Sequence, residues 1–197
     1  MSIFKIHTKE SVEREVSDLF DEKEKHLGFV PNIFAVIAES TPAAQAFDEL
    51  SNYFDQCNFT DAEKETIEIV TSIENGCGYC VAGHTAFAET KRVPGHIIKS
   101  LRENQVVDNP RIEALAVFTR AMIRSRGKIS QKELILFFDA GFTKTHLIEV
   151  VLGICLKFLT NLVSNSTSVP LDPAFEPYFW SENQEHGSHD GPKAQAI

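Results

Sequence analysis

Apolar side chains recur along the chain at helical spacing almost throughout. In residues 10–26, for example, Val12, Val16 and Phe20 fall on one stripe among charged neighbours, which predicts an amphipathic surface helix. No long stretch of the sequence alternates apolar and polar residues as a half-buried strand does, and no internal repeat is evident. The pattern therefore predicts an all-α protein.

Capping and turn signals divide this pattern into separate helices. Thr60 with Glu63 and Ser130 with Glu133 have the spacing of capping boxes, while Thr41 before Pro42 and Asp108 before Pro110 indicate further helix starts. The expected helices cover residues 10–26, 32–39, 41–57, 60–75, 77–90, 95–103, 108–126, 130–139 and 143–163. After Pro170 we expect irregular chain, and residues 182–197 are polar enough to be disordered.

Composition and charge narrow the class of protein. A globular composition and 197 residues suit a single domain. We expect an all-α helical domain over residues 1–172, with a C-terminal extension over residues 173–197. The formal net charge is −9 and the sequence has no Lys/Arg cluster, so we expect neither nucleic acid nor a membrane as a partner.

The cellular compartment bears on the four cysteines. The first ten residues lack the apolar run of a signal peptide, and the apolar segment 147–163 contains Glu149 and Lys157, which favours a buried helix over a membrane span. We therefore expect a cytoplasmic protein with reduced thiols. In that compartment a close cysteine pair indicates redox chemistry or metal binding rather than a static crosslink.

The candidate chemistry lies in residues 65–84, ETIEIVTSIENGCGYCVAGH. Cys77 and Cys80 form a C-x-x-C pattern, and His84 follows Cys80 by one helical turn. At about 100° per residue, the three side chains fall within about 60° of arc on one helix face. A histidine one turn from a thiol can take its proton, and the free N–H groups of a helix start stabilise a thiolate. The arrangement favours thiolate attack on a peroxide or a disulfide.

A carboxylate on the preceding helix is the candidate partner of this group. Glu65 borders the apolar stripe of that helix, where partial loss of hydration would raise its pKa and suit proton transfer. The alternative is a solvated glutamate without a role, which is what we expect of Glu63 and Glu68. Cys57 and Cys155 are expected to behave as small apolar residues outside the site.

Spacing alone also allows a zinc site with Cys77, Cys80 and His84 as three ligands. The sequence contains no second C-x-x-C and no H-x-x-x-H to supply a fourth ligand, so we expect redox chemistry without a bound metal. It also contains no phosphate-binding loop or dinucleotide fingerprint, and we expect no cofactor.

The pattern E-(x)11-C-x-Y-C-(x)3-H, filled by Glu65, Cys77, Tyr79, Cys80 and His84, resembles the signature of the AhpD-like proteins of the carboxymuconolactone decarboxylase superfamily. The likeness covers about residues 26–172. Three further segments resemble the peroxidase-related subgroup, in the same order along the chain: LGFVPNIF at 27–34, DAGFT at 139–143, and VPL at 169–171 after Asn161.

This resemblance implies an all-α fold with the C-x-x-C at the start of a core helix, assembled as trimers or hexamers. It implies that Cys80 attacks a hydroperoxide, that Cys77 resolves the sulfenic acid as a disulfide, and that an external dithiol reduces the pair. Glu65 and His84 would form the proton relay. Tyr79 stands where well-known members have histidine, and at neutral pH a tyrosine offers a hydrogen bond rather than a base.

Two other functions remain open at this point. A carboxymuconolactone decarboxylase-type enzyme on the same fold would not need the cysteine pair. A non-enzymatic, zinc-bound or structural helical protein would need neither peroxide nor reductant. A homo-oligomer is expected in addition, because the segment 147–163 and the Phe-rich run 134–142 present much apolar surface for a chain of this size.

Overall fold

The computed structural model describes residues 4–182, and that part of the chain is helical without any strand. The all-α fold predicted from the apolar spacing is therefore confirmed. The α-helices are α1 (Arg14–Leu27), α2 (Asn32–Ile37), α3 (Thr41–Asp55), α4 (Asp61–Glu74), α5 (Gly78–Thr90), α6 (Gly95–Arg102), α7 (Pro110–Arg124), α8 (Gln131–Asp139) and α9 (Lys144–Thr167), and the 3₁₀ helices are η1 (Lys9–Ser11) and η2 (Pro173–Tyr178).

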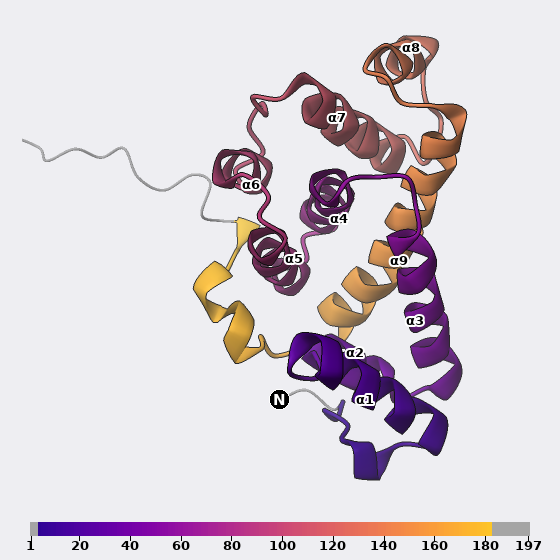
Figure 1. Ribbon diagram of the computed structural model, residues 1–197, viewed down its shortest axis with the longest axis vertical. Helices are drawn as coiled ribbons and strands as arrows, with labels where there is room; N and C mark the ends of the chain where they lie inside the picture. Colours follow the sequence, from indigo (N-terminus) through magenta and orange to yellow (C-terminus); the bar gives the residue numbers. More distant parts are fainter. Residues whose placement is uncertain (1–3, 183–197) are drawn as a thin grey trace, which may run out of the picture.

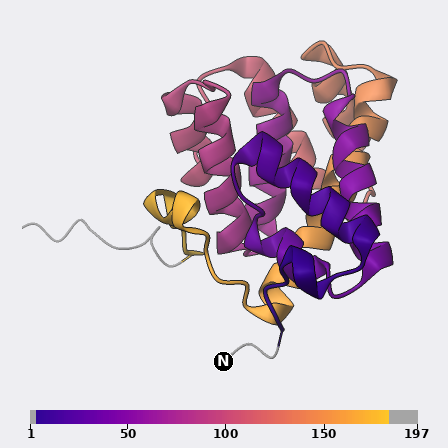
Figure 2. The same ribbon diagram turned by 60° about the horizontal axis from the view of Figure 1, so that its bottom comes forward.

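Helix α4 lies in the middle of the molecule, with α5, α6, α7 and α9 around it (Figure 1). Its buried residues run without a break from Glu63 to Ser72, so the helix has no solvent face along this stretch. The N-terminal helices α1 and α2 pack at one end of the bundle, and the segment after α9 runs back along α5 (Figure 2).

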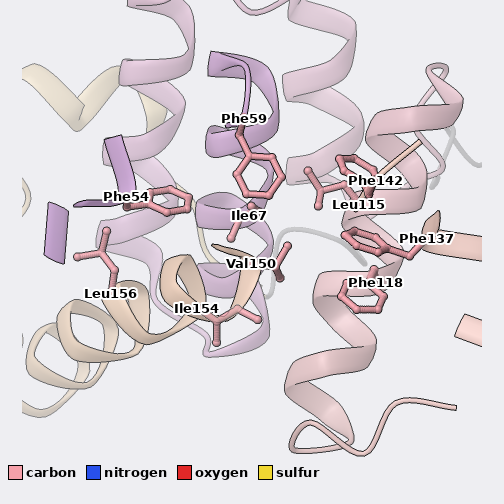
Figure 3. Close-up of a cluster of buried hydrophobic side chains, with 10 residues drawn as sticks. All are labelled: Phe54, Phe59, Ile67, Leu115, Phe118, Phe137, Phe142, Val150, Ile154 and Leu156. Carbon is pink, nitrogen blue, oxygen red and sulfur yellow. The ribbon is translucent and has the colours of Figure 1, made fainter. Parts of the chain in front are cut away.

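Three apolar clusters hold the helices together. The largest joins α3, α4, α7, α8 and α9, and contains a stack in which the ring of Phe137 lies 4.0 Å from that of Phe118 and 4.6 Å from that of Phe142 (Figure 3). A second cluster packs α6 and α7 against α4, and a third joins α1, α2 and α3 around Phe20 and Phe34. The phenylalanine-rich composition thus fills the interior between helices.

Most helix starts follow the predicted caps. Thr60 with Glu63 and Ser130 with Glu133 form the expected capping boxes. Two caps differ by one residue: Ser40, not Thr41, caps α3 by accepting from the N–H of Ala43, and the side chain of Asn109, not Asp108, caps α7. In both cases the true cap has the extended backbone that points its side chain at the first free N–H groups. Helix α9 also runs past residue 163 to Thr167, and the expectation of disorder from residue 183 onward lies outside the described residues.

By length and composition alone, helix α9 could cross a membrane. In its most apolar 18-residue window, 39% is buried inside the protein. It packs against α3 and α4 and buries Lys157 and Asn161, as a core helix does. Its outer side exposes Ile148, Val151 and Leu162. The cytoplasmic location, the oligomer and the division at residue 172 stay predictions.

Gly153 allows the close contact of α9 with α3 and α4, because a Cβ there would lie 2.6 Å from Phe54 and 2.9 Å from Ile67. We expect Gly153→Ala to lower the free energy of unfolding, since overpacking costs about 1–3 kcal/mol against the ~1 kcal/mol that alanine gains in a helix. Urea denaturation checks this, with Gly95→Ala as control because a Cβ at Gly95 meets nothing within 4 Å. Equal stability changes in the two variants would contradict the packing argument.

Candidate active site

The C-x-x-C pair is positioned by the turn between α4 and α5. Gly76 adopts the left-handed backbone conformation, with φ of 61°, and the N–H of Cys77 donates to the carbonyl of Ser72 at 2.8 Å. The chain thereby reverses tightly, and Cys77 becomes the N-cap residue of α5 while Cys80 lies in its first turn. The prediction of a C-x-x-C at the start of a core helix is confirmed.

A cluster of charged side chains is buried between α4, α5 and α9. His84 Nδ1 lies 3.0 Å from Glu65 Oε2 and 3.2 Å from Glu68 Oε2. On the other side of the ring, Lys157 Nζ lies 2.5 Å from His84 Nε2. Lys91 Nζ donates to the second oxygen of Glu65 at 2.8 Å. Both glutamates and Lys157 are buried, so the cluster exists only because each charge has a partner.

These contacts define where the protons are. Nδ1 of His84 faces two carboxylates, so it carries a proton and donates it. Nε2 faces the amino group of Lys157, and two protons in that short contact would repel. While both thiols are protonated, His84 Nε2 and Lys157 Nζ therefore share one positive charge, which together with Lys91 balances Glu65 and Glu68.

The pKa shifts follow from this cluster. Burial by itself would raise the pKa of Glu68, but His84 as charge and hydrogen-bond donor, with Lys157 and Lys91, lowers the pKa of Glu68 to about 2. Burial lowers the pKa of His84, and Lys157 does the same, but the charges of Glu68 and Glu65 outweigh them and leave the pKa of His84 raised. Glu68 is thus an anion, and His84 is a stronger base than a free imidazole.

The two thiols face a polar stripe on α9. Lys157, Thr160, Asn161 and Ser164 are buried at helical spacing on this otherwise apolar helix. Thr160 Oγ1 lies 3.9 Å from the Cys80 sulfur, and Asn161 and Ser164 contribute further hydrogen bonding to Cys80 and Cys77. His84 lies opposite Lys157, Cys80 opposite Thr160, and Cys77 opposite Ser164. The numbers fall along α5 as they rise along α9, so the two helices lie side by side and antiparallel.

The two sulfurs carry a single negative charge between them. The Cys80 thiol donates to the Cys77 sulfur, and with Ser164 and Lys157 this lowers the pKa of Cys77 to about 6 although burial opposes it. Burial, followed by the neighbouring Cys77, raises the pKa of Cys80 well above its ordinary value, so the second proton is held. The proton between two adjacent sulfurs can move to either one, and the charge belongs to the pair.

A cavity of about 490 Å³ opens onto this site. Cys80 lines it together with His84 and Lys157, whereas Cys77 is not in the lining and has no exposed surface. Five phenylalanines provide much of the wall: Phe34, Phe47, Phe54, Phe87 and Phe175. Exposed lining residues at the ends of α1 and α3, such as Leu27 and Asn52, mark its opening. Access to a substrate therefore favours Cys80 as the attacking sulfur.

Tyr79 has a structural place beside this cavity. Its hydroxyl donates to Asp172 Oδ2 at 2.5 Å and accepts from the N–H of Ile33 at 3.1 Å. Burial, followed by the bond to Asp172, raises the pKa of Tyr79 far above its ordinary value, so the phenol stays protonated. Tyr79 thus fastens the segment after α9 to α5, and Phe175 of that segment packs against Gly83 of α5.

The structure brings together all five residues predicted from the sequence, but not in one chain of contacts. His84 bonds Glu65, as expected. Within residues 4–182, however, no hydrogen bond joins His84 to Cys80, and Cys77, Cys80 and His84, which spacing alone would allow as zinc ligands, do not form a group close enough to share an ion. The group that comes close enough to share a metal is Glu65, Glu68 and His84, where Lys91 and Lys157 already supply positive charge.

Several expectations about single residues are wrong. Glu63 and Glu68 are buried rather than solvated, because α4 is surrounded on all sides; Glu63 pairs with Arg111. Cys155 is exposed, on the outer side of α9. Sequence reasoning missed Lys157 as a site residue, although a lone lysine in the apolar segment 147–163 was a signal for it. It also missed Asp172, for which no sequence signal exists.

Comparison with known proteins agrees with this geometry. Residues 41–120 match the carboxymuconolactone decarboxylase family. The fold is similar to that of a peroxidase-related protein with an alkylhydroperoxidase AhpD core from Ralstonia eutropha JMP134, with TM-score 0.81, 21% identity, and coverage of 88% of this chain and 94% of that one. A peroxidase-related protein from Silicibacter sp. TM1040 gives TM-score 0.75, 20% identity, and coverage of 88% and 92%.

The debrominase Bmp8 has the same fold. An alanine variant of one of its cysteines, in complex with 2,3,4-tribromopyrrole, gives TM-score 0.73 and 18% identity, covering 90% of this chain and 97% of that one. No curated protein matches the sequence. The family match and the shared fold confirm the resemblance to AhpD-like proteins.

Acid should weaken the buried cluster through Glu68. Because its pKa in the folded protein is about 2, below the ordinary value of 4.5, its contribution to stability is complete above pH 4.5 and is lost as pH falls toward 2. We expect Glu68→Gln to lower the free energy of unfolding at pH 7 by about 2–3 kcal/mol and by less at pH 3. Urea denaturation at both pH values measures this, with exposed Glu103→Gln as control. A loss as large at pH 3 as at pH 7 would contradict the pairing of Glu68.

Proposed function

We propose that this AhpD-like protein of the carboxymuconolactone decarboxylase superfamily is a thiol-dependent peroxidase, which reduces hydroperoxides with the cysteine pair Cys77 and Cys80. The observation that carries the proposal is Cys80 in the wall of a largely apolar cavity, with the Cys77 thiol in contact with its own and a buried Glu65–His84 pair beside it.

The proposed reaction has two steps on the protein. The Cys80 thiolate attacks the terminal oxygen of the hydroperoxide, the O–O bond breaks, and a sulfenic acid and an alcohol form. The Cys77 thiol then condenses with the sulfenic acid, which gives a disulfide and water. An external dithiol, either a reductant protein or a small thiol, restores the pair by thiol–disulfide exchange.

Glu65 and His84 support the first step as a proton relay. Glu65 fixes the Nδ1–H tautomer of His84, and this leaves Nε2 as the base that faces the interior of the site. Lys91 holds the other oxygen of Glu65, so the carboxylate keeps one orientation. Burial makes this orientation rigid, which general acid–base catalysis requires.

A second candidate is reductive dehalogenation by the same thiols. It is favoured by the volume of about 490 Å³ and the aromatic lining of the cavity, together with the fold shared with debrominase Bmp8. A third is a decarboxylase-type reaction, which matches the family name but gives the cysteine pair no part.

One assay distinguishes the three. Purified protein is given hydrogen peroxide, an organic hydroperoxide or 2,3,4-tribromopyrrole, each with a dithiol, or a lactone or carboxylic acid without one. Wild type is compared with Cys80→Ser and with the double variant Cys77→Ser, Cys80→Ser. Turnover of hydroperoxide that is lost in Cys80→Ser supports the proposal. Bromide release without hydroperoxide turnover would replace it by dehalogenation. If an activity on a lactone or carboxylic acid survives Cys77→Ser with Cys80→Ser, the decarboxylase is favoured.

One equivalent of hydroperoxide should join Cys77 to Cys80 and leave Cys57 and Cys155 free. The two site thiols are in contact, whereas Cys155 lies on the outer side of α9. In Cys77→Ser, the sulfenic acid should persist on Cys80 and react with a sulfenic-acid probe. Peptide mapping by mass spectrometry reads both outcomes. A sulfenic acid formed on Cys77 in Cys80→Ser, at the wild-type rate, would reverse the two roles.

Glu65→Gln and His84→Gln should each slow thiol oxidation by about 10²–10⁴-fold, because each removes proton transfer at this site. The double variant should be little slower than either single one, since members of one relay act as a unit. The measurement is the oxidation rate against pH for the four proteins, with circular dichroism to confirm the fold. Strictly additive losses would show that the two residues act separately.

A further inference from the structure

His84 does not itself reach the thiol that reacts. Its Nδ1 bonds carboxylates and its Nε2 faces Lys157, and the hydrogen-bond partner of Cys80 on α9 is Thr160. Lys157 lies one turn before Thr160 and Asn161 on the same buried stripe. Lys157 contacts the imidazole directly, its charge acts on both thiols, and its amino group belongs to a residue that lines the cavity.

We propose that Lys157 is a catalytic residue of the thiol reaction, which takes the proton of the cysteine pair together with His84 and gives it to the oxygen that leaves the substrate. This rests on the proposed peroxidase function and names the acid and base of that site.

The charge balance of the cluster allows this transfer. With both thiols protonated, the single proton shared by His84 and Lys157, plus Lys91, cancels the charges of Glu65 and Glu68. When a thiol loses its proton to the shared pair, His84 and Lys157 each become cationic, so their short contact must lengthen, and the extra positive charge meets the new thiolate. The total stays at zero in both states, so no uncompensated charge is created in a buried site.

The chemical steps balance. The thiol gives its proton to the His84–Lys157 pair. The thiolate attacks the hydroperoxide, an S–O bond forms and the O–O bond breaks, and the departing alkoxide takes the proton from Lys157 and leaves as an alcohol. Condensation of the sulfenic acid with the second thiol then releases water, and the external dithiol returns both thiols. Lys157 ends the cycle as it began.

The titratable groups around Lys157 come from the end of α3, from α4, and from α5 with the residues that flank it. They are Glu65, Glu68, His84, Cys77, Cys80 and Lys91, with Asp55 from the end of α3 at the cavity wall. Any pH profile of the site therefore reports this whole set.

Two substitutions separate charge from proton transfer. Lys157→Met removes both, whereas Lys157→Arg keeps the charge on a group that does not release its proton. Lys64→Met is the matched control, because Lys64 is a second buried lysine whose amino group bonds the carbonyl of Asp55 instead of the site. All variants are made with Cys57→Ser and Cys155→Ser, so that thiolate absorbance near 240 nm reports only the site pair.

The first measurement is the titration of the thiolate, which needs no substrate. Lys157→Met should raise the apparent thiol pKa by about one to three pH units, since the thiolate loses its nearest cation. Lys157→Arg and Lys64→Met should titrate like the parent protein. If Lys157→Met titrates like Lys64→Met in a folded protein, the pairing of Lys157 with the thiolate is disproved.

The second measurement is single-turnover thiol oxidation at a pH where each variant is a thiolate. With an alkyl hydroperoxide, whose leaving alkoxide needs a proton, Lys157→Met and Lys157→Arg should both be slower by about 10²–10⁴-fold. With a peracid, whose leaving carboxylate does not, the loss should be less than about 10-fold. Equal losses with both oxidants, or full rates in Lys157→Arg with the alkyl hydroperoxide, would overturn the proton transfer.

The two measurements also distinguish this proposal from the function on which it rests. Parent protein that reacts with neither oxidant would remove the peroxidase function, and the titration would still decide whether Lys157 is paired with the thiolate. Parent protein that reacts normally, with Lys157 variants that behave like Lys64→Met, would leave the peroxidase function and overturn the role of Lys157.

Discussion

The structure depends on a buried ionic cluster in which Glu65 and Glu68 of α4, His84 of α5 and Lys157 of α9 balance one another. A buried charge without a partner costs several kcal/mol. If one of the three helices moved or lost its charged residue, the charges on the other two would be left buried without a partner. The same requirement fixes the distance between the helices, which Gly153 allows at the contact of α9 with Phe54 and Ile67. The core thereby holds a set of acids and bases in one geometry.

The antiparallel pairing of α5 with α9 places the polar side chains of α9 beside His84 and the two cysteines of α5. Each turn of α5 meets a polar residue of α9, so that His84, Cys80 and Cys77 lie in a row. Because these side chains are buried, the two thiols carry one negative charge between them, and few neighbouring groups can accept the thiol proton. The cavity is lined by Cys80 and not by Cys77, which distinguishes the two cysteines by their access to a molecule in it.

The segment after α9 completes the site from outside. Asp172 accepts from Tyr79 and from the N–H of Asn32, which ties α2, α5 and the returning chain together. Phe175 then closes part of the cavity against Gly83. A histidine at position 79 could not reproduce this pair of bonds in a permanently neutral form, and the tyrosine belongs to the wall of the cavity.

The sequence by itself determined the helices, their capping boxes at Thr60 and Ser130, and the shared face of Cys77, Cys80 and His84, because these depend on short-range periodicity and on side chains near their own backbone. It also indicated Glu65, through its place beside an apolar stripe. Only the tertiary structure decided that Glu68 is buried, that His84 meets Lys157 before it meets a thiol, and that Asp172 holds Tyr79. Those contacts join helices far apart in the chain, and a local pattern carries no information about which residue of a distant helix will lie opposite, since that is fixed by how the whole set of helices packs.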